Sequence, residues 1–334
     1  MLVTEDGRLT GAISGGCLEG DALRKAQLVM SRRQPMLVTY DTTDEDDAKL
    51  GVGLGCEGII HIMIEPIDVS NPANPIAMLK SALAQRQHAV LVTLFSLHDR
   101  KAAQPGTCLF QPEEGDMISN LQDDGLCPSI KADAKAVLSG GQSDIKNYVS
   151  GENNFTAFFE LLKPAVSMIV VGAGNDVQPL VEMAGILGWQ ITVADGRSGF
   201  ATAERFPLAN RLLTVKPEKL LEKVTIDSQT VFVLMTHNYN YDLKVLRQLI
   251  GLPVSYTGML GPRKKLERIL SELQEEGALS TDKGLPPVHG PVGLDLGAET
   301  PEEIALSIIA EIKAVLAGRS GKPLKERESS IHQF

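Results

Sequence analysis

The chain has 334 residues, of which 43% are hydrophobic and 22% charged, with a formal net charge of −10 at pH 7. This length exceeds one ordinary core and predicts two domains, and the acidic balance argues against binding nucleic acid through a basic face. No apolar run reaches the roughly 20 residues of a membrane helix, and the start, MLVTEDG, lacks the features of a signal peptide. We therefore expect a cytoplasmic protein without a membrane partner, whose four cysteines are reduced thiols.

The first forty residues predict a hairpin followed by a helix and a further strand. Asp6-Gly7 is a hairpin turn signal between two short stretches with strand character. Apolar residues at helical spacing come next, before a proline and another apolar stretch. The expected elements are strands over 1–6 and 9–13, a helix over 18–30 and a strand over 36–40.

A loop of unusual composition, SGGCLE, lies between the hairpin and the helix. A glycine pair lets the backbone turn tightly and approach a ligand closely. A thiol at the start of a helix sits where the helix dipole favours the thiolate. The loop is consistent with presenting a sulfur to a ligand, and equally with a buried structural cysteine. The residues of interest are Ser14, Gly15, Gly16, Cys17 and Glu19.

A second glycine-rich segment surrounds another cysteine. Residues 50–58 read LGVGLGCEG, which places Gly55 and Cys56 in a loop before an apolar strand over 59–64. The acidic stretch just before it lacks the spacing of a helix-loop-helix calcium motif, so we expect a solvated loop. The cysteines of the chain form no C-x-x-C pair, which argues against a structural zinc site.

The middle of the chain is less regular. Periodicity weakens from 98 to 150, and Cys108 and Cys127 lie there without glycine neighbours, which favours a structural role for both thiols. The expected elements are helices over 75–86 and 129–138 and a strand over 89–95. We expect the change of domain between 151 and 164.

Beyond Pro164, apolar strands and helices alternate regularly. The continuous apolar run 166–171 is typical of a strand buried on both faces. A helix over 176–187 follows, and TPEE at 300–303 forms a capping box before a last helix with one apolar stripe. Further strands are expected over 190–194, 211–215, 231–235 and 254–257. This α/β alternation predicts a doubly wound parallel sheet. The expected domains are a mixed α+β domain over 1–155, a Rossmann-like domain over 164–318 and a polar tail over 319–334.

The sequence GAGND follows the first buried strand and opens a helix, which is the context of a dinucleotide-binding turn. Gly172 and Gly174 supply two of its three glycines, and Val177 takes the place of the third. Asp195 ends the next strand, where an acid can bond a ribose hydroxyl. Asp176, however, places negative charge where a pyrophosphate would lie. A nucleotide or other phosphate-bearing ligand and a purely structural turn both remain open.

Two further strand ends carry polar candidates. His237 follows the strand over 231–235 and could donate to a phosphate, act as an acid or base, or cap the next helix. Gly261 and Arg263 follow the strand over 254–257. Basic residues at the start of a helix oppose its dipole, which indicates an anionic partner or a solvated charge run.

Eight segments carry a resemblance that runs in order over nearly the whole chain. They are GAISGGCLE (11–19), GLGC (53–56), VGAG (171–174), LGW (187–189), DGR (195–197), MTH (235–237), YTGMLG (256–261) and PVGLDLGAETPEEIA (291–305). Together they resemble the XdhC/CoxI family, accessory proteins of xanthine dehydrogenase-type molybdenum enzymes. The ordered set is much more specific than the glycine turn alone.

This resemblance implies a maturation factor, a chaperone for cofactor insertion rather than a catalyst. It implies that the chain binds the molybdenum cofactor (molybdopterin), holds it while a cysteine desulfurase supplies sulfur, and delivers it to a xanthine dehydrogenase-type enzyme. The sequence does not decide the oligomeric state, for which a homodimer is the candidate. Thiolates are plausible soft ligands for molybdenum, which implies Cys17 and Cys56 as metal ligands. The implied cofactor-site residues are Ser14, Gly15, Gly16, Cys17, Glu19, Gly55, Cys56, Gly172, Gly174, Asp195, Arg197, His237, Gly261 and Arg263.

Two departures from the family pattern matter. Members usually carry some tens of residues before the point where this chain starts, so we expect an N-terminally short form. Glu57 stands where many members have a glycine, and its carboxylate would repel an anionic cofactor. The alternative function is an NAD(P)-dependent oxidoreductase or another nucleotide-dependent enzyme that uses the Rossmann half, although the glycine fingerprint for it is incomplete.

Overall fold

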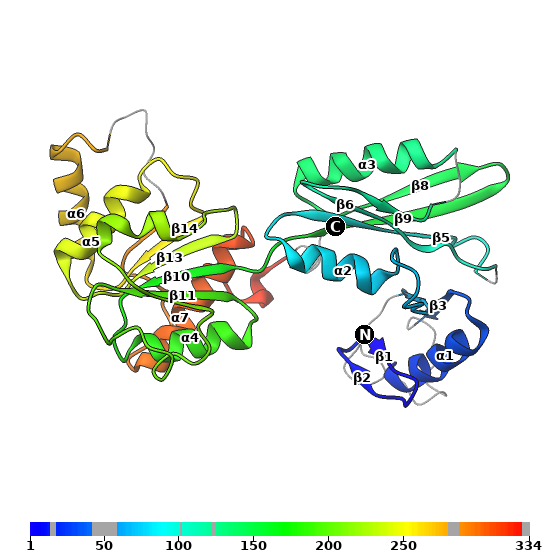
Figure 1. Cartoon of the computed structure of the whole chain (residues 1–334), viewed down its shortest axis with the longest axis horizontal. Helices are drawn as coiled ribbons and strands as arrows, with labels where there is room; N and C mark the ends of the chain where they lie inside the picture. Colours follow the sequence, from blue (N-terminus) through cyan, green and yellow to red (C-terminus); the bar gives the residue numbers. More distant parts are fainter. Residues whose placement is uncertain (14–17, 42–58, 101, 122–124, 280–286, 329–334) are drawn as a thin grey trace. The chain divides into compact units, whose positions relative to one another are not determined.

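The computed structural model describes residues 1–13, 18–41, 59–100, 102–121, 125–279 and 287–328 (Figure 1). The chain divides into two compact units, one over Met1–Pro164 and one that begins at Ala165. Each unit has its own hydrophobic clusters and is described by itself.

The first unit begins with two short antiparallel pairs and a helix between them. β1 pairs with β2, and β3 pairs with β4 along six residues of each strand. One face of α1 is buried through Ala22, Ala26 and Val29, which share the helical spacing seen in the sequence. These elements are β1 (Leu2–Val3), β2 (Leu9–Thr10), α1 (Glu19–Arg32), β3 (Met36–Asp41) and β4 (Ile59–Ile64).

A five-stranded antiparallel sheet in the order β7-β6-β5-β9-β8 forms the centre of the first unit. Its elements are α2 (Pro75–Ala84), β5 (Ala89–Phe95), β6 (Gly106–Pro112), β7 (Ile118–Ser119), α3 (Cys127–Gly140), β8 (Asp144–Ser150) and β9 (Asn153–Leu162). Val90 and Val92 of β5 pack in the same cluster as residues of α3. Ala89 and Leu91 pack with Met78 of α2. Because successive strand residues face opposite sides, the two helices cover opposite faces of this sheet (Figure 1).

Four of the described strands lie where the sequence showed weak or no periodicity. β6, β7 and β8 fall within 98–150, and β9 fills most of the stretch 151–164, where we expected the change of domain. β8 is an edge strand whose residues alternate between half-buried and exposed, so polar side chains dominate its sequence. β9 pairs with β5 on one side and β8 on the other. The division between units therefore follows β9, after Pro164.

The second unit is built on a six-stranded parallel sheet in the order β12-β11-β10-β13-β14-β15. Its strands are β10 (Ser167–Val171), β11 (Gln190–Asp195), β12 (Arg211–Thr214), β13 (Thr230–Leu234), β14 (Tyr256–Met259) and β15 (Val288–His289). The chain enters this sheet in the middle, moves to one edge and then returns to fill the other side. This order confirms the predicted doubly wound parallel sheet.

Helices cover both faces of the parallel sheet. They are α4 (Val177–Ile186), α5 (Tyr239–Leu249), α6 (Arg263–Glu275) and α7 (Pro301–Leu316), with short 3-10 turns η2 (Pro217–Lys219), η3 (Leu221–Lys223) and η4 (Leu324–Glu326). Met168 and Val170 of β10 pack with residues of α4 and α7. Ile169 and Val171 pack with residues of α5 and α6 on the other face. None of the helices in the described residues is both long and apolar enough to cross a membrane.

The capping box of α7 gives a direct test of the sequence argument. The Thr300 hydroxyl accepts the Glu303 N–H at 3.3 Å, and the Glu303 carboxylate accepts the Thr300 N–H at 3.0 Å. We expect Thr300→Ala to lower the free energy of unfolding by about 1 kcal/mol, because an orphan helix N–H loses its acceptor. Urea unfolding at pH 7 measures this loss. Thr300→Ser keeps the hydroxyl and should unfold like the wild type; an equal loss in both variants would contradict the capping role.

Candidate functional site

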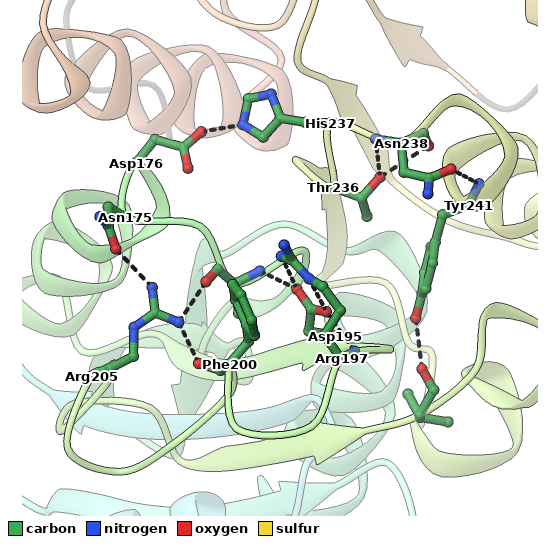
Figure 2. A network of polar contacts seen from close by, with 12 residues as sticks. Asn175, Asp176, Asp195, Arg197, Phe200, Arg205, Thr236, His237, Asn238 and Tyr241 are labelled. Atoms are coloured by element: carbon green, nitrogen blue, oxygen red, sulfur yellow. Dashed lines mark hydrogen bonds and ion pairs between the residues drawn. The ribbon is translucent and has the colours of Figure 1, made fainter.

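The strand order brings together the predicted site residues of the second unit at the carboxyl ends of the parallel strands, which we call the carboxyl edge of the sheet. β10 and β13 are neighbours, yet α4 after β10 and α5 after β13 cover opposite faces. Ligands of open α/β sheets bind beyond the carboxyl ends of the strands at such a switch point. The predicted residues at this edge are Gly172 and Gly174 after β10, Asp195 and Arg197 at β11, His237 after β13, and Gly261 and Arg263 after β14. Figure 2 shows the polar contacts among several of them.

Gly172 allows β10 and β13 to approach closely at this edge. Its φ of +115° lies in the region that L side chains rarely adopt, and an added Cβ would lie 2.3 Å from the Met235 carbonyl oxygen. The Gly172 N–H donates to the Ala194 oxygen at 2.8 Å, and the Met235 N–H donates to the Val171 oxygen at 2.7 Å. The glycine is therefore required by tertiary packing as well as by the turn.

Asp195 joins the glycine turn to the loop after β11. One carboxylate oxygen accepts the Ala173 N–H at 2.8 Å and Nη2 of Arg197 at 2.8 Å. The other accepts the backbone N–H of Arg197 at 2.8 Å and its Nε at 3.0 Å. Burial alone would raise the pKa of Asp195, but the bonds from Arg197 and Ala173 outweigh it and lower that pKa. Both oxygens are thus engaged within the protein, where the sequence suggested a ribose contact.

Arg205 holds the same turn from the outside, and sequence reasoning missed it. Its Nη1 donates to the carbonyl oxygens of Ala173 at 2.7 Å and Phe200 at 2.6 Å, and its Nη2 donates to Oδ1 of Asn175 at 2.9 Å (Figure 2). An arginine in a loop carries no local signal for such a role. Its contacts depend on the loop after β11 folding back beside the turn after β10.

His237 lies across the switch point from the start of α4. Its Nε2 is 2.8 Å from a carboxylate oxygen of Asp176, and its side chain is 64% exposed (Figure 2). Its φ of 53° is in the left-handed region, which non-glycine residues adopt uncommonly. Asn238 caps α5 by accepting the Tyr241 N–H at 3.1 Å, so the capping role considered for His237 belongs to its neighbour.

A buried ion pair supports this edge between β13 and β14. Asp242 is fully buried and accepts the Thr236 hydroxyl at 2.6 Å and the Lys265 ammonium at 2.5 Å. The ammonium also donates to the Leu260 oxygen at 3.1 Å, beside Gly261 with its φ of +131°. Charges this deeply buried require such partners. The sequence signal that could have found Asp242 is a carboxylate four residues after a helix N-cap.

Arg263 differs from the other edge residues. Its Nε pairs with a carboxylate oxygen of Glu267 at 3.0 Å, one turn further along α6, and its side chain is 81% exposed. Surface pairs at this spacing contribute little to stability. This contact matches the solvated charge run that the sequence allowed, and the anionic partner stays a prediction.

Comparison with known proteins places this geometry in a family. Residues 168–312 match the XdhC Rossmann domain, and residues 1–41 match the XdhC and CoxI family. A Bacillus subtilis protein, named as a probable xanthine dehydrogenase subunit, is 31% identical over 326 residues, which is 93% of this chain and 86% of that protein. The chain belongs to the XdhC and CoxI family. The resemblance drawn from its motifs is thereby confirmed.

Two further relatives of this XdhC/CoxI chain extend over most of its length. The molybdenum cofactor insertion chaperone PaoD of Escherichia coli is 23% identical over 315 residues, 94% of this chain and 77% of that protein. A crystal structure described as a xanthine dehydrogenase from Bacillus halodurans superposes with a TM-score of 0.76 and 28% identity, covering 97% of this chain and 88% of that one. The similarity therefore includes both units.

The N-terminal predictions for this family member fall mostly outside the described residues. This is so for Ser14, Gly15, Gly16, Cys17, Gly55 and Cys56, and the idea that both cysteines share one site stays a prediction. Glu19 is the first residue of α1, and its Oε1 accepts the Ile13 N–H at 3.1 Å, across the SGGC loop. Among the residues that the structure describes, no three His, Cys, Asp or Glu side chains gather closely enough to hold a metal.

The close approach at Gly172 predicts a large effect of a single methyl group. We expect Gly172→Ala to destabilise the second unit by about 3 kcal/mol, from a left-handed alanine and a clash with backbone. Gly188→Ala is the matched control, because its φ is also positive at +71° but nothing lies within 4 Å of the added carbon. It should cost about 1 kcal/mol of backbone strain. Equal losses in thermal unfolding would show that the Met235 contact is unimportant.

The two described thiols should differ in reactivity. Burial, assisted by the charge of Glu65 and by Cys127, raises the pKa of Cys108 to about 12, so almost none is thiolate at pH 8. We expect iodoacetamide at pH 8 to leave Cys108 unmodified in the native protein, while the half-buried Cys127 reacts. Peptide mass spectrometry measures both sites, with urea-unfolded protein as the control. Rapid native labelling of Cys108 would contradict its structural role.

Proposed function

We propose that this chain is a maturation factor that binds the molybdenum cofactor, holds it for sulfuration and delivers it to a xanthine dehydrogenase-type enzyme. The observation that carries the proposal is similarity along nearly the whole chain to a molybdenum cofactor insertion chaperone, within a family that includes a protein named as a probable component of xanthine dehydrogenase. A cysteine desulfurase is the proposed sulfur donor, and a homodimer the proposed assembly.

The start of α4 supports phosphate binding at the glycine turn. Within the described residues, the backbone N–H groups of Gly174, Asn175 and Asp176 donate to no protein acceptor. N–H groups at a helix start, together with the helix dipole, favour a phosphate such as that of the pterin. The Asp176 carboxylate opposes this charge. Its Oδ1 lies at the turn, 2.3 Å from the position of a Cβ added to Gly174, and its Oδ2 is 2.8 Å from Nε2 of His237. Phosphate binding would therefore require this carboxylate to move away from Gly174, with His237 as its partner.

The thiols of the N-terminal unit supply the second part of the proposal. Cys17 and Cys56 each lie in a glycine-rich segment, and soft thiolates suit the sulfur-rich coordination of molybdenum. In this proposal one thiolate holds the metal while sulfur is installed. Ser14, Gly15, Gly16 and Glu19 would then shape the loop that presents Cys17.

The engagement of Asp195 argues against the oxidoreductase alternative. An NAD-binding Rossmann site uses the acid at the end of the second strand to accept a ribose hydroxyl. Here both oxygens of Asp195 already accept bonds from Ala173 and Arg197. Ribose binding would therefore require breaking contacts that a buried carboxylate needs.

Cofactor content measured after purification tests the proposal. We expect wild-type protein from cells that make the cofactor to carry molybdenum and pterin, and Cys17→Ala to carry about tenfold less, because a metal ligand is lost. Molybdenum is measured by elemental analysis and pterin by fluorescence after oxidation. Cys127→Ala is the matched control and should retain wild-type amounts.

Two outcomes would contradict this view. Equal cofactor in wild type and Cys17→Ala would remove the thiol-ligand role. No cofactor in either protein, combined with heat released on titration with NAD(H), would favour the oxidoreductase.

A further inference from the structure

We propose that β8, the edge strand of the antiparallel sheet in the first unit, pairs with β8 of a second copy of this chain and joins the two sheets into one. The two strands run antiparallel about a two-fold axis at Asn147. This inference rests on the proposed function in one respect, because it gives the proposed homodimer its interface.

β8 has a strand neighbour on one side only. In the described part of the chain the sheet order ends at β8, which pairs with β9 along all seven of its residues (Figure 1). Such an edge presents unpaired N–H and C=O groups, and natural proteins usually guard it with a proline, a bulge or a lysine. Residues 144–150 contain no proline. Their one lysine is held elsewhere, because Nζ of Lys146 pairs with Asp133 of α3 at 2.6 Å. The edge is therefore open to another strand.

The backbone groups of alternate residues face away from β9. The turn between β8 and β9 has two residues, so the pair that flanks it, which includes Ser150, is hydrogen-bonded, and every second residue before it also bonds to β9. Ile145 agrees with this alternation, because its N–H donates within β8 itself, to Oδ1 of Asp144 at 2.8 Å. The backbone groups of Ile145, Asn147 and Val149 are thus those at the open edge.

The side chains of the same three residues lie on the face of the strand opposite α3. Ile145 is 50% exposed and Val149 is 69% exposed, and both are β-branched. Between them, Oδ1 of Asn147 accepts the Thr156 hydroxyl at 3.0 Å, which holds the amide toward β9. Side chains of this kind stabilise a sheet by packing on cross-strand neighbours, so their exposure on an edge strand indicates an additional strand.

Contacts on the other face hold β8 in its extended conformation before any partner binds. The Tyr148 hydroxyl donates to Oδ2 of Asp133 at 2.5 Å, and the same carboxylate pairs with Lys146. Tyr148 also packs against the hydrophobic cluster between the sheet and α3. A strand that is already ordered loses little conformational entropy when it pairs.

The sequence of β8 matches a second copy of itself. When two copies run antiparallel about Asn147, Ile145 of one lies opposite Val149 of the other, and all seven residues of each strand are paired. No two residues of like charge are opposed in this register, whereas a register centred on Lys146 would oppose two lysines. An unrelated strand would lack this match. The opposed pairs are Asp144 with Ser150, Ile145 with Val149, Lys146 with Tyr148, and Asn147 with itself.

Sedimentation of the full chain over a range of micromolar concentrations tests the interface. We expect a dimer for the wild type. Ile145→Lys and Val149→Glu should each weaken it about tenfold, because the two-fold axis places each change in the interface twice. Val149→Pro should abolish it, since proline removes an N–H at the open edge of each copy but leaves the bonds between β8 and β9 intact.

A double variant tests the register and guards against misfolding of the single variants. Ile145→Lys combined with Val149→Glu places lysine opposite glutamate at both ends of the interface, so the dimer should be restored toward wild-type strength. Ile145→Lys combined with Val149→Lys is the matched control and should remain weak. Leu83→Lys changes an apolar residue of α2 that is 82% exposed, away from β8, and should dimerise like the wild type.

Three results would overturn the interface. They are a wild-type chain that stays monomeric throughout the concentration range, a dimer that Val149→Pro leaves unchanged, and no restoration by the lysine–glutamate double variant. Molybdenum content is not part of this measurement. A monomer that carries the cofactor would refute the interface alone, and a dimer that carries none would refute cofactor binding alone.

Discussion

The carboxylate of Asp195 is the interaction on which the candidate site depends. A buried charge is costly unless donors surround it, and here four N–H groups from two segments do so. The same bonds join the turn after β10 to the loop after β11. The arrangement of Ala173 and Arg197 is therefore a consequence of satisfying one carboxylate, and the two segments cannot shift independently without leaving it unpaired.

Packing behind the carboxylate makes this arrangement possible. The missing side chain at Gly172 lets its backbone lie against the Met235 carbonyl, which brings β13 close enough for His237 to reach Asp176. On the far side of β13, Asp242 and Lys265 form a second satisfied buried charge. The carboxyl edge thus combines two internally neutralised acids with N–H groups at the start of α4 that find no acceptor in the described part of the chain.

Several parts of this site could be predicted from local sequence. Gly172 and Gly174 follow a continuous apolar run, and a strand followed at once by glycines and a helix is a local signal. The position of Asp195 at the end of the next strand was predictable for the same reason. The partners of Asp195 could not be predicted, because the same carboxylate oxygens can accept hydrogen bonds either from a ligand or from the protein. In the structure they accept them from the Ala173 N–H and from Arg197. Arg205 and Asp242 were missed because their contacts join segments that are far apart in the chain or deeply buried.

The sequence by itself determined the family, the alternation of strands and helices after Pro164, and the capped start of α7. Each of these follows from the order or the periodicity of residues that are close together in the chain. It did not reveal β8 and β9, whose mixed polar and apolar residues reflect an edge strand and its partner. Only the tertiary structure decided the strand order and the hydrogen bonds of Asp195. The strand order depends on long-range packing, and the hydrogen bonds of Asp195 depend on which donors other segments bring to its buried charge. Neither is a property of any single segment.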